Sequence, residues 1–223
     1  MKLRVASYNV RACADVGFDP SVIAKDVVEV GADVVGLQEV DENNRRSNID
    51  TVKLLNEACG YDCRFAKAID YKGGEYGHAV MSRLNVISSK VVPLSSEGCE
   101  NRVAMVNVIE KDGVKFQFVN THLDHTSLER RTVQYGEVKD AIDTSMPYII
   151  TGDFNTCDFN EFDLFVKDGA YLVNNKDNYL PSFIPSAIAI DNIVLSKEFK
   201  YLGCGIQTVI HSDHRMIWAD IEL

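Results

Sequence analysis

Apolar and polar residues along the chain follow two different periods, and each period predicts one kind of element. Short runs in which apolar side chains alternate with polar ones, or stand together, are typical of β-strands. Such runs predict strands at residues 3–10, 33–40, 63–69, 77–82, 86–93, 103–109, 115–121, 148–151, 189–196 and 216–222. The dipeptide Asp112-Gly113 stands between two of these runs and predicts a hairpin turn.

Apolar residues three to four positions apart predict helices at residues 20–30, 50–59, 127–143 and 160–168. Pro20 suits the first position of a helix, and Gly31 and Gly60 each follow the last periodic residue of theirs. Some strands are joined by helices and others by hairpins, which indicates mixed sheets covered by helices. No repeat or linker interrupts the pattern, so we expect one domain over residues 1–223.

The chain has 223 residues and a formal net charge of −10. Proteins that bind nucleic acid gather lysine and arginine to replace counterions, whereas the only basic doublets here are Arg45-Arg46 and Arg130-Arg131. We expect the second doublet on the solvated face of its helix. The charge therefore disfavours tight duplex binding, and it also disfavours an anionic membrane surface.

The six cysteines are scattered and form no Cys-x-x-Cys pair. We interpret them as reduced thiols in a cytoplasmic protein. We also expect no signal peptide and no transmembrane segment, because no apolar stretch approaches the roughly 18 residues that a spanning helix needs.

Side chains that bind metals or move protons stand at the ends of the predicted strands. They are Asn9, Glu39, His122, Asp124, Asp153, Asn155, Asp191, Asp213 and His214. Each one alone has an ordinary explanation, as a turn residue, a solvated strand end or a hydrogen-bonded core histidine. Independent turn residues, however, need not all be carboxylate, amide or imidazole, so the set as a whole indicates one polar site.

Two other interpretations of these residues fail. A calcium loop that starts at Asp153 would need Gly at its sixth position and Glu at its twelfth, where this chain has Asp158 and Leu164. The triplet Ser212-Asp213-His214 suggests a hydrolase triad, but the chain contains no Gly-x-Ser-x-Gly elbow.

The chemistry of the remaining set is that of a metal-dependent hydrolase. Carboxylate and amide oxygens favour Mg²⁺ or Mn²⁺, and no cysteine is placed to join them. Histidines beside carboxylates serve as general bases or as donors to a charged phosphoryl group. The set therefore predicts the attack of activated water on a phosphate ester.

The motifs SYNV, LQEV, THLD, TGDFN, IDNIVLS and SDH, in this order from Ser7 to His214, resemble the endonuclease/exonuclease/phosphatase superfamily. The stretches LQEVDENNRRS, FAKAIDYKGGEYGHAVMSR and THLDHTSLERRTVQ are similar to its small bacterial metal-dependent hydrolases. The resemblance implies an α/β fold, a four-layer α/β/β/α sandwich of two mixed, mostly antiparallel sheets. It places the site where the loops of the two sheets meet.

The resemblance also implies a role for each matching residue. Glu39 would be the principal metal ligand, with Asn9 and Asp213 contributing nearby. Asp153 and Asn155 would hold the attacking water and the phosphate, and whether they also hold a second metal ion is open.

The histidines complete the implied machinery. His214, oriented by Asp191, would be the general base or a hydrogen-bond donor to the phosphate. His122 would stabilise negative charge on the phosphate oxygens. Whether Asp153 or His214 takes the proton of water stays open at this level.

The residues expected to contact substrate are less certain matches. His78 in EYGHAVMSR stands where relatives usually carry Asn, and it is expected to face the phosphate. Arg46 and Asp124 are further candidates for substrate binding, and Lys67 and Arg102 are weaker candidates of the same kind.

The leading hypothesis is a Mg²⁺- or Mn²⁺-dependent phosphoesterase, a phosphodiesterase acting on a small or lipid-derived substrate. One alternative is an endonuclease or exonuclease on DNA or RNA. The segment PSFIPSAIAI argues against it, because it is apolar where relatives are often basic or polar. The other alternative is a non-catalytic phosphate-binding scaffold, which would be expected to have lost catalytic residues that are all present here.

Overall fold

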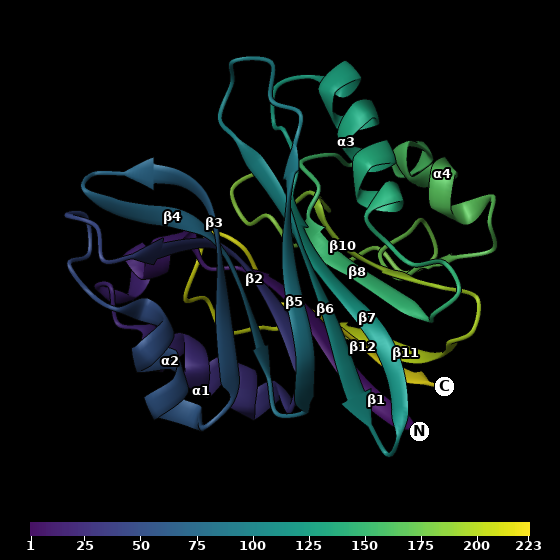
Figure 1. Cartoon of the computed structure of the whole chain (residues 1–223), viewed down its shortest axis with the longest axis horizontal. Helices are drawn as coiled ribbons and strands as arrows, with labels where there is room; N and C mark the ends of the chain where they lie inside the picture. Colours follow the sequence, from purple (N-terminus) through teal and green to yellow (C-terminus); the bar gives the residue numbers. More distant parts are fainter.

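The computed structural model describes residues 1–223 and contains two six-stranded sheets that lie face to face (Figure 1). The first sheet has the order β11 (Lys200–Ile206), β12 (Ile217–Glu222), β1 (Lys2–Asn9), β2 (Val34–Glu42), β4 (Gly74–Ser82) and β3 (Asp62–Tyr71). The second has the order β5 (Asn85–Leu94), β6 (Arg102–Lys111), β7 (Val114–His122), β8 (Tyr148–Asp153), β10 (Asp191–Leu195) and β9 (Tyr171–Leu172).

Helices cover the outer face of each sheet (Figure 1). The first sheet carries α1 (Pro20–Val30) and α2 (Thr51–Cys59), and the second carries α3 (Leu128–Asp140) and α4 (Asp163–Val166). The buried apolar residues form three clusters, one between the sheets and one beneath each pair of helices. These layers confirm the four-layer α/β/β/α sandwich of two mixed sheets.

The alternation of side chains across a strand explains why β1 carries buried apolar residues on both of its faces. Leu3 and Val5 belong to the cluster between the sheets, whereas Ala6 and Tyr8 belong to the cluster beneath α1 and α2. Successive side chains of a strand point to opposite faces. A strand covered on both faces therefore loses the simple alternation of apolar and polar residues.

The helix signals in the sequence correspond to real caps. Asp19 accepts a hydrogen bond from the Ser21 amide at 2.9 Å, and Gly31 ends α1 in the left-handed conformation. The helix expected to run to residue 143 ends at Asp140 instead. Gln117 of β7 explains this end, because its amide pairs with both the N–H and the C=O of Asp143.

Several elements differ from the pattern-based expectation. The helix expected at residues 160–168 is a 3₁₀ turn, η2 (Phe159–Phe162), followed by the short α4. The pattern missed β9, β11 and the 3₁₀ segment η1 (Arg11–Val16). In β11, Gly203 and Gly205 weaken the strand signal, yet Gly205 is required, because a Cβ there would lie 2.1 Å from the Trp218 ring.

Two parallel strand pairs bring the chemistry to one end of the molecule. β1 runs parallel to β2 in one sheet, β7 runs parallel to β8 in the other, and all other neighbours are antiparallel. The carboxyl ends of a parallel pair lie at the same edge, so His122 of β7 is in register with Asp153 of β8. Gly152 permits this close pairing, because a Cβ there would lie 2.5 Å from the Thr121 carbonyl oxygen.

A buried polar layer joins the two sheets beneath this end. Asn120 of β7 donates to the carbonyl oxygens of Leu37 and Ala79 in the opposite sheet, at 2.9 and 3.0 Å. Its own oxygen accepts a hydrogen bond from Gln38 at 2.6 Å. Gly36 leaves the room for this layer, because a Cβ there would lie 2.4 Å from the Asn120 oxygen. The layer fixes the relative position of the strands that carry the polar ends.

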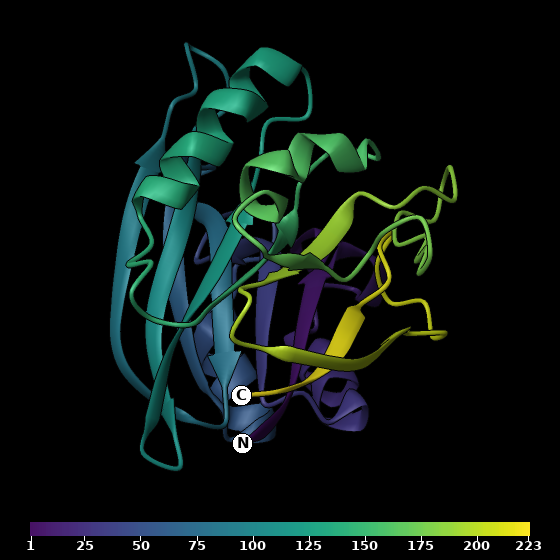
Figure 2. The same cartoon turned by 90° about the vertical axis from the view of Figure 1, so that its right-hand side faces the viewer.

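The two termini lie beside each other (Figure 2), and the Met1 amino group donates to the Leu223 carbonyl at 2.7 Å. The six cysteines are all unpaired. None of the helices is both long enough and apolar enough to cross a bilayer.

Candidate active site

A cleft of about 460 Å³ opens where the strand ends and loops of the two sheets meet. It is lined by Glu39, Tyr76, Glu100, Arg102, His122, His125, Asp153, Asn155, Phe183, Ile188, Ile190, Asp213 and His214. Six of the residues predicted at strand ends thus line one cavity, although they come from distant parts of the chain.

Asp153, at the end of β8, is the centre of this arrangement. It is 2 % exposed, and its Oδ1 accepts a hydrogen bond from the Asn155 amide at 2.9 Å. Its Oδ2 lies 3.6 Å from His122 Nε2 and 3.7 Å from His214 Nε2. These separations exceed those of direct hydrogen bonds, so the two imidazoles and the carboxylate face one another with no direct bond between them. Burial first, and the nearby charge of Asp191 second, raise the pKa of Asp153 to about 7.

His214 is held by a carboxylate on its other side. Its Nδ1 lies 2.8 Å from Asp191 Oδ2, and both side chains are buried. Burial by itself lowers the pKa of His214, but the charge and hydrogen bond of Asp191, with Asp153 and Asp213, outweigh it and raise the pKa to about 10. The predicted orientation of His214 by Asp191 thus has direct geometric support.

Glu39 enters the cleft from an irregular point in β2. The pairing of β2 with β4 shifts register between Leu37 and Val40, and Glu39 has a φ of 57°. Left-handed backbone in a non-glycine residue costs about 1 kcal/mol or more and clusters at functional sites. The bulge turns Glu39 into the cleft, where its Oε1 accepts a hydrogen bond from Asn9 and its Oε2 makes no bond within the protein.

Asn9 stands between two carboxylates. Its Nδ2 donates to Glu39 Oε1 and to Asp153 Oδ2, both at 3.0 Å, while its Oδ1 accepts from the Arg11 amide. The nitrogen of the amide therefore faces the carboxylates. In this geometry Asn9 orients both carboxylates, and its contribution to metal binding stays a prediction.

The other predicted groups of the cleft are accessible. Asn155 has a left-handed φ of 54°, and its Nδ2 donates to the Leu123 carbonyl, which leaves its amide oxygen without a protein partner. Asp213 lies 3.5 Å from Arg11 Nε, and both side chains are partly exposed.

His122 and His78 pack against each other with tilted rings. His122 is the last residue of β7, and its ring centroid lies 6.1 Å from that of His78 in β4, with 53° between the ring planes. His78 is 1 % exposed and is not among the residues that line the cleft. It therefore lies behind His122, whereas it was expected to face the phosphate in the open cavity. Burial, with Arg102 next in importance, lowers the pKa of His78 to about 3 and also lowers the pKa of His122.

Asp124 and Arg131 do not lie where they were expected. Asp124, predicted to bind substrate, is buried and is not among the residues that line the cleft. It accepts hydrogen bonds from the Thr126 and Ser127 amides and pairs with Arg130, so it stabilises the start of α3. Arg131, expected in solvent, is a largely buried partner of Glu161, with two bonds of 2.8 Å.

Arg46 lies beside the cleft and not in it. Its guanidinium bonds the buried Asp41 at 2.5 and 2.8 Å and lies over the Tyr71 ring, in a pocket of about 110 Å³ that shares Tyr76 with the cleft. Lys67 is half-exposed and pairs with carboxylates of the β3–β4 hairpin.

The structure adds three residues to the predicted set. Tyr76, Glu100 and His125 line the cleft although no role was predicted for them, whereas Arg102, a weaker candidate, proves to be an almost fully buried wall residue. Polar side chains next to the strand ends in THLDH and ENR were the available signal.

An apolar wall stands on another side of the cleft. Phe183, Ile188 and Ile190 line it, and the Phe183 ring lies 5.0 Å from the His214 ring. Phe183 and Ile188 are paired by two main-chain hydrogen bonds, and Ile184 donates to the Asp213 carbonyl at 2.9 Å. The wall is therefore attached to the loop that carries Asp213 and His214.

The donor set fits a hard divalent cation. Asp153 is buried with Asp191 and His214, and one ligand atom from each lies within 4.8 Å of the others. No lysine or arginine pairs with Asp153, so its charge lacks a cationic partner apart from histidine. Glu39 adds an oxygen without a protein partner, and carboxylate oxygens of this kind are ligands that Mg²⁺ and Mn²⁺ prefer.

Comparison with known proteins identifies the family. A model of the endonuclease/exonuclease/phosphatase family matches residues 6–214. The chain belongs to this family. Members of the endonuclease/exonuclease/phosphatase family are hydrolases that act on phosphate esters. A sequence search of curated proteins finds no match.

Solved structures of the family share the fold at low sequence identity. A family member from Beutenbergia cavernae has a TM-score of 0.87 and 22 % identity, over 100 % of this chain and 72 % of that one. The mannosyl-6-phosphatase of Bacteroides thetaiotaomicron has a TM-score of 0.81 and 22 % identity, over 99 % of this chain and 100 % of that one. The human nocturnin catalytic domain with bound sulfate has a TM-score of 0.79 and 21 % identity, over 99 % and 93 %.

Proposed function

We propose that this protein is a Mg²⁺- or Mn²⁺-dependent phosphodiesterase that hydrolyses a small or lipid-derived substrate with an activated water. The observation that carries the proposal is the geometry around Asp153. One buried carboxylate oxygen and two imidazole nitrogens lie 3.6 and 3.7 Å apart at the same part of the cleft, so a water bonded to Asp153 and a phosphoryl oxygen bonded to the imidazoles can lie side by side there.

Glu39 is the principal metal ligand in this proposal, with Asp153 and Asp213 on the same cleft. Asn9 keeps Glu39 and Asp153 in place through its two hydrogen bonds. When bound, a divalent cation would neutralise charge on the phosphoryl oxygens and lower the pKa of bound water. Asn155 offers its amide oxygen to the water or the substrate.

Asp153 and His214 divide the proton chemistry. The pKa of Asp153, raised to about 7 by burial and Asp191, suits a carboxylate that accepts the proton of water near neutral pH. The pKa of His214, raised to about 10, keeps its imidazole protonated, so it donates a charge-assisted hydrogen bond to a phosphoryl oxygen. His122 donates a further hydrogen bond from the opposite side.

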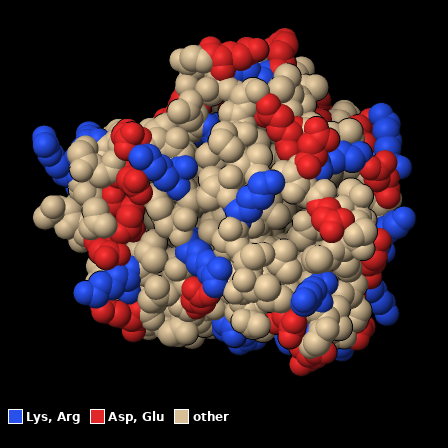
Figure 3. Space-filling model, viewed as in Figure 1, with Lys and Arg blue, Asp and Glu red and all other residues tan.

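The shape and charge of the cleft support a diester with an apolar substituent. A diester carries two organic groups, and the cleft offers an apolar wall at Phe183, Ile188 and Ile190 and a polar wall at Tyr76 and Arg102. On the face shown in Figure 3, lysine and arginine are interspersed with aspartate and glutamate and form no continuous basic surface. A duplex would need such a surface. Both sheets contribute to the one cleft, which supports the prediction of a single domain.

The test is hydrolysis of bis(p-nitrophenyl) phosphate against p-nitrophenyl phosphate, with Mg²⁺, with Mn²⁺ and with EDTA. We expect metal-dependent cleavage that favours the diester and falls at least about 100-fold in Asp153→Asn and in Glu39→Gln. Glu110→Gln, a carboxylate at the Lys111 end of β6, serves as the matched control and should keep the wild-type rate.

Each contrary result has a defined meaning. Full activity in Glu39→Gln or Asp153→Asn, with both variants folded, would refute the proposed site. A preference for the monoester would place the protein with the phosphatases, as the name of its Bacteroides thetaiotaomicron neighbour suggests. Cleavage of an oligonucleotide that weakens steeply with salt would favour the nuclease alternative.

A further inference from the structure

Four buried nitrogens without hydrogen-bond partners gather at one end of the cleft. They are Nδ1 and Nε2 of His78, Nε of Arg102 and Nδ1 of His122. In the whole chain only ten buried side-chain atoms lack a partner, so four of them in one place mark a local feature. An unsatisfied buried polar group is destabilising. Groups left in this state together mark a part of the cleft wall whose hydrogen-bonding capacity the protein itself does not use.

Arg102 is the charged member of this group. It begins β6, lines the cleft and is 4 % exposed. Its Nη2 lies 3.5 Å from Nδ1 of His125, which also lines the cleft and is exposed to solvent. A guanidinium is always charged and offers five N–H donors in a flat fork, and here its Nε is not used at all.

The one carboxylate that pairs with Arg102 is a weak competitor. Glu100 Oε1 lies 2.8 Å from Arg102 Nη1, but the Glu100 side chain is 42 % exposed. The exposed carboxylate stays partly hydrated, which weakens its hold on the guanidinium. A ligand with more than one negative oxygen can therefore displace Glu100 or share the guanidinium with it.

The Arg102 end of the cleft is distinct from the reaction centre. His122 turns Nε2 toward Asp153, whereas its Nδ1 is on the other side of the ring and has no partner. Arg102 makes no hydrogen bond or ion pair with Glu39, Asp153 or Asp213, and its polar contacts are with Glu100 and His125.

We propose that Arg102 and His125, next to His122, form a second anion subsite, which binds a phosphate group of the substrate other than the one that is hydrolysed. The guanidinium fork of Arg102 and the exposed imidazole of His125 supply N–H donors from two residues, which suits an anion with several oxygens. His78 is a positioning residue behind His122. The assignment to a substrate phosphate rests on the proposed function, whereas the binding of the anion itself does not.

Metal-free protein separates the two sites experimentally. In EDTA the reaction centre holds the carboxylates of Glu39, Asp153 and Asp213 without a cation, and these repel phosphate. Inorganic phosphate titrated by calorimetry into this form should bind one ion per chain. We expect Arg102→Gln to weaken that binding at least about tenfold and Glu100→Gln to strengthen it severalfold, because the competing carboxylate is removed.

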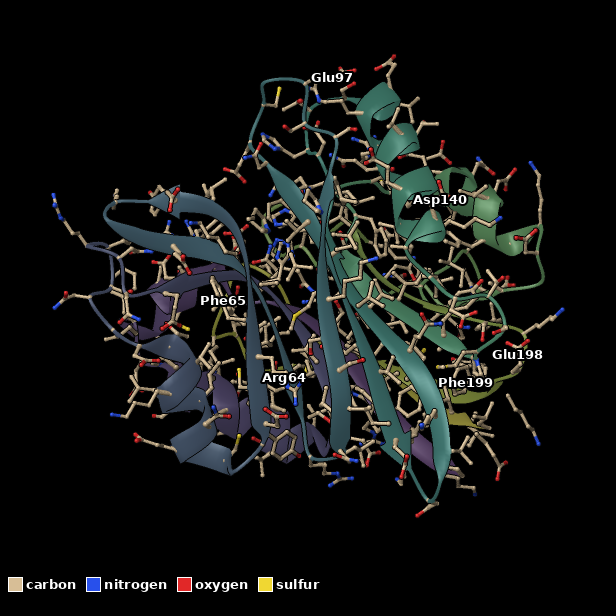
Figure 4. The ribbon with its side chains drawn as sticks, viewed as in Figure 1. Arg64, Phe65, Glu97, Asp140, Glu198 and Phe199 are labelled. Carbon is tan, nitrogen blue, oxygen red and sulfur yellow. The ribbon has the colours of Figure 1, made fainter.

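The control is Arg64→Gln. Like Arg102 with Glu100, Arg64 pairs with the carboxylate two residues before it, Asp62. Arg64 lies on β3, far from the loop that carries Glu97 and leads to Arg102 (Figure 4). Phosphate affinity should be unchanged in this variant. Because Arg102 is buried, the exposed His125→Gln provides a second variant whose fold is not at risk, and it should weaken phosphate binding severalfold.

The outcomes separate this inference from the proposed function. Lack of phosphate binding by wild-type protein in EDTA, or equal binding by Arg102→Gln, His125→Gln and Arg64→Gln, would overturn the subsite. Phosphate binding that follows the expected order supports it even if no ester is hydrolysed. In the metal-loaded enzyme, Arg102→Gln should raise KM for a substrate with a second phosphate at least tenfold more than it raises KM for bis(p-nitrophenyl) phosphate.

Discussion

The charge of His214 depends on Asp191, and replacement of Asp191 by Asn tests this directly. The 2.8 Å contact between Asp191 Oδ2 and His214 Nδ1 is buried on both sides. In the wild type, Asp191 outweighs the effect of burial and raises the pKa of His214 from 6.5 to about 10. That difference corresponds to roughly 5 kcal/mol of preference for the protonated imidazole. Asn keeps the shape of the side chain and removes its negative charge.

We expect the pKa of His214 in Asp191→Asn to fall by about 3 units, to near its ordinary value, because burial then acts with less opposition. The assay is NMR titration of the imidazole carbons in EDTA-treated protein, which has only five histidines to assign. His214→Gln identifies the resonance. A pKa that moves by less than about one unit would refute the argument that Asp191 holds the charge on His214.

The same shift has a consequence for stability. The folded pKa of His214 lies above the unfolded value, so its contribution is complete below pH 6.5 and is lost as the pH rises through about 10. The unfolding free energy of metal-free wild-type protein should therefore decline across this window. In Asp191→Asn the decline should be shallower, as urea unfolding at several pH values will show.

Three further predictions concern packing and metal binding. Gly36→Ala should destabilise the fold by about 1–3 kcal/mol, because the new Cβ would lie 2.4 Å from the Asn120 oxygen. Gly136→Ala in α3 is the control, since its Cβ would meet nothing within 4 Å, and it should be neutral or stabilise the fold by up to about 1 kcal/mol. Urea denaturation measures the unfolding free energy of both variants. Asn120→Ala should cost about 2–4 kcal/mol in the same assay, because the carbonyls of two strands and the Gln38 amide lose their partner. The gain in Tm caused by Mg²⁺ or Mn²⁺ should grow between about pH 5.5 and about pH 8.5, because Asp153, with a pKa of about 7, must lose its proton to bind the metal. A gain in Tm that is constant with pH would contradict the placement of Asp153 beside the metal.

Local signals in the sequence predicted elements well where the physics is local. The bounds of α1 follow from Asp19, Pro20 and Gly31, whose backbone preferences act within one turn. The element β11 escaped prediction because its stability comes from its partner β12 and from the contact of Gly205 with Trp218, both distant in sequence. The early end of α3 has the same kind of cause, since Gln117 of another strand holds Asp143.

The candidate site shows the same division. The types of residue that could bind a metal and a phosphate, and their places at or near strand ends, were determined by the sequence alone, because a polar group on a buried strand is most easily accommodated where the strand reaches the surface. Tertiary structure decided which of them meet: it brought Glu39 into the cleft through a bulge, turned the nitrogen of Asn9 toward the carboxylates and placed Asp124 outside. It also brought Arg102 and His125 together beside His122. Such contacts depend on the register and packing of two sheets, which no local pattern of residues encodes.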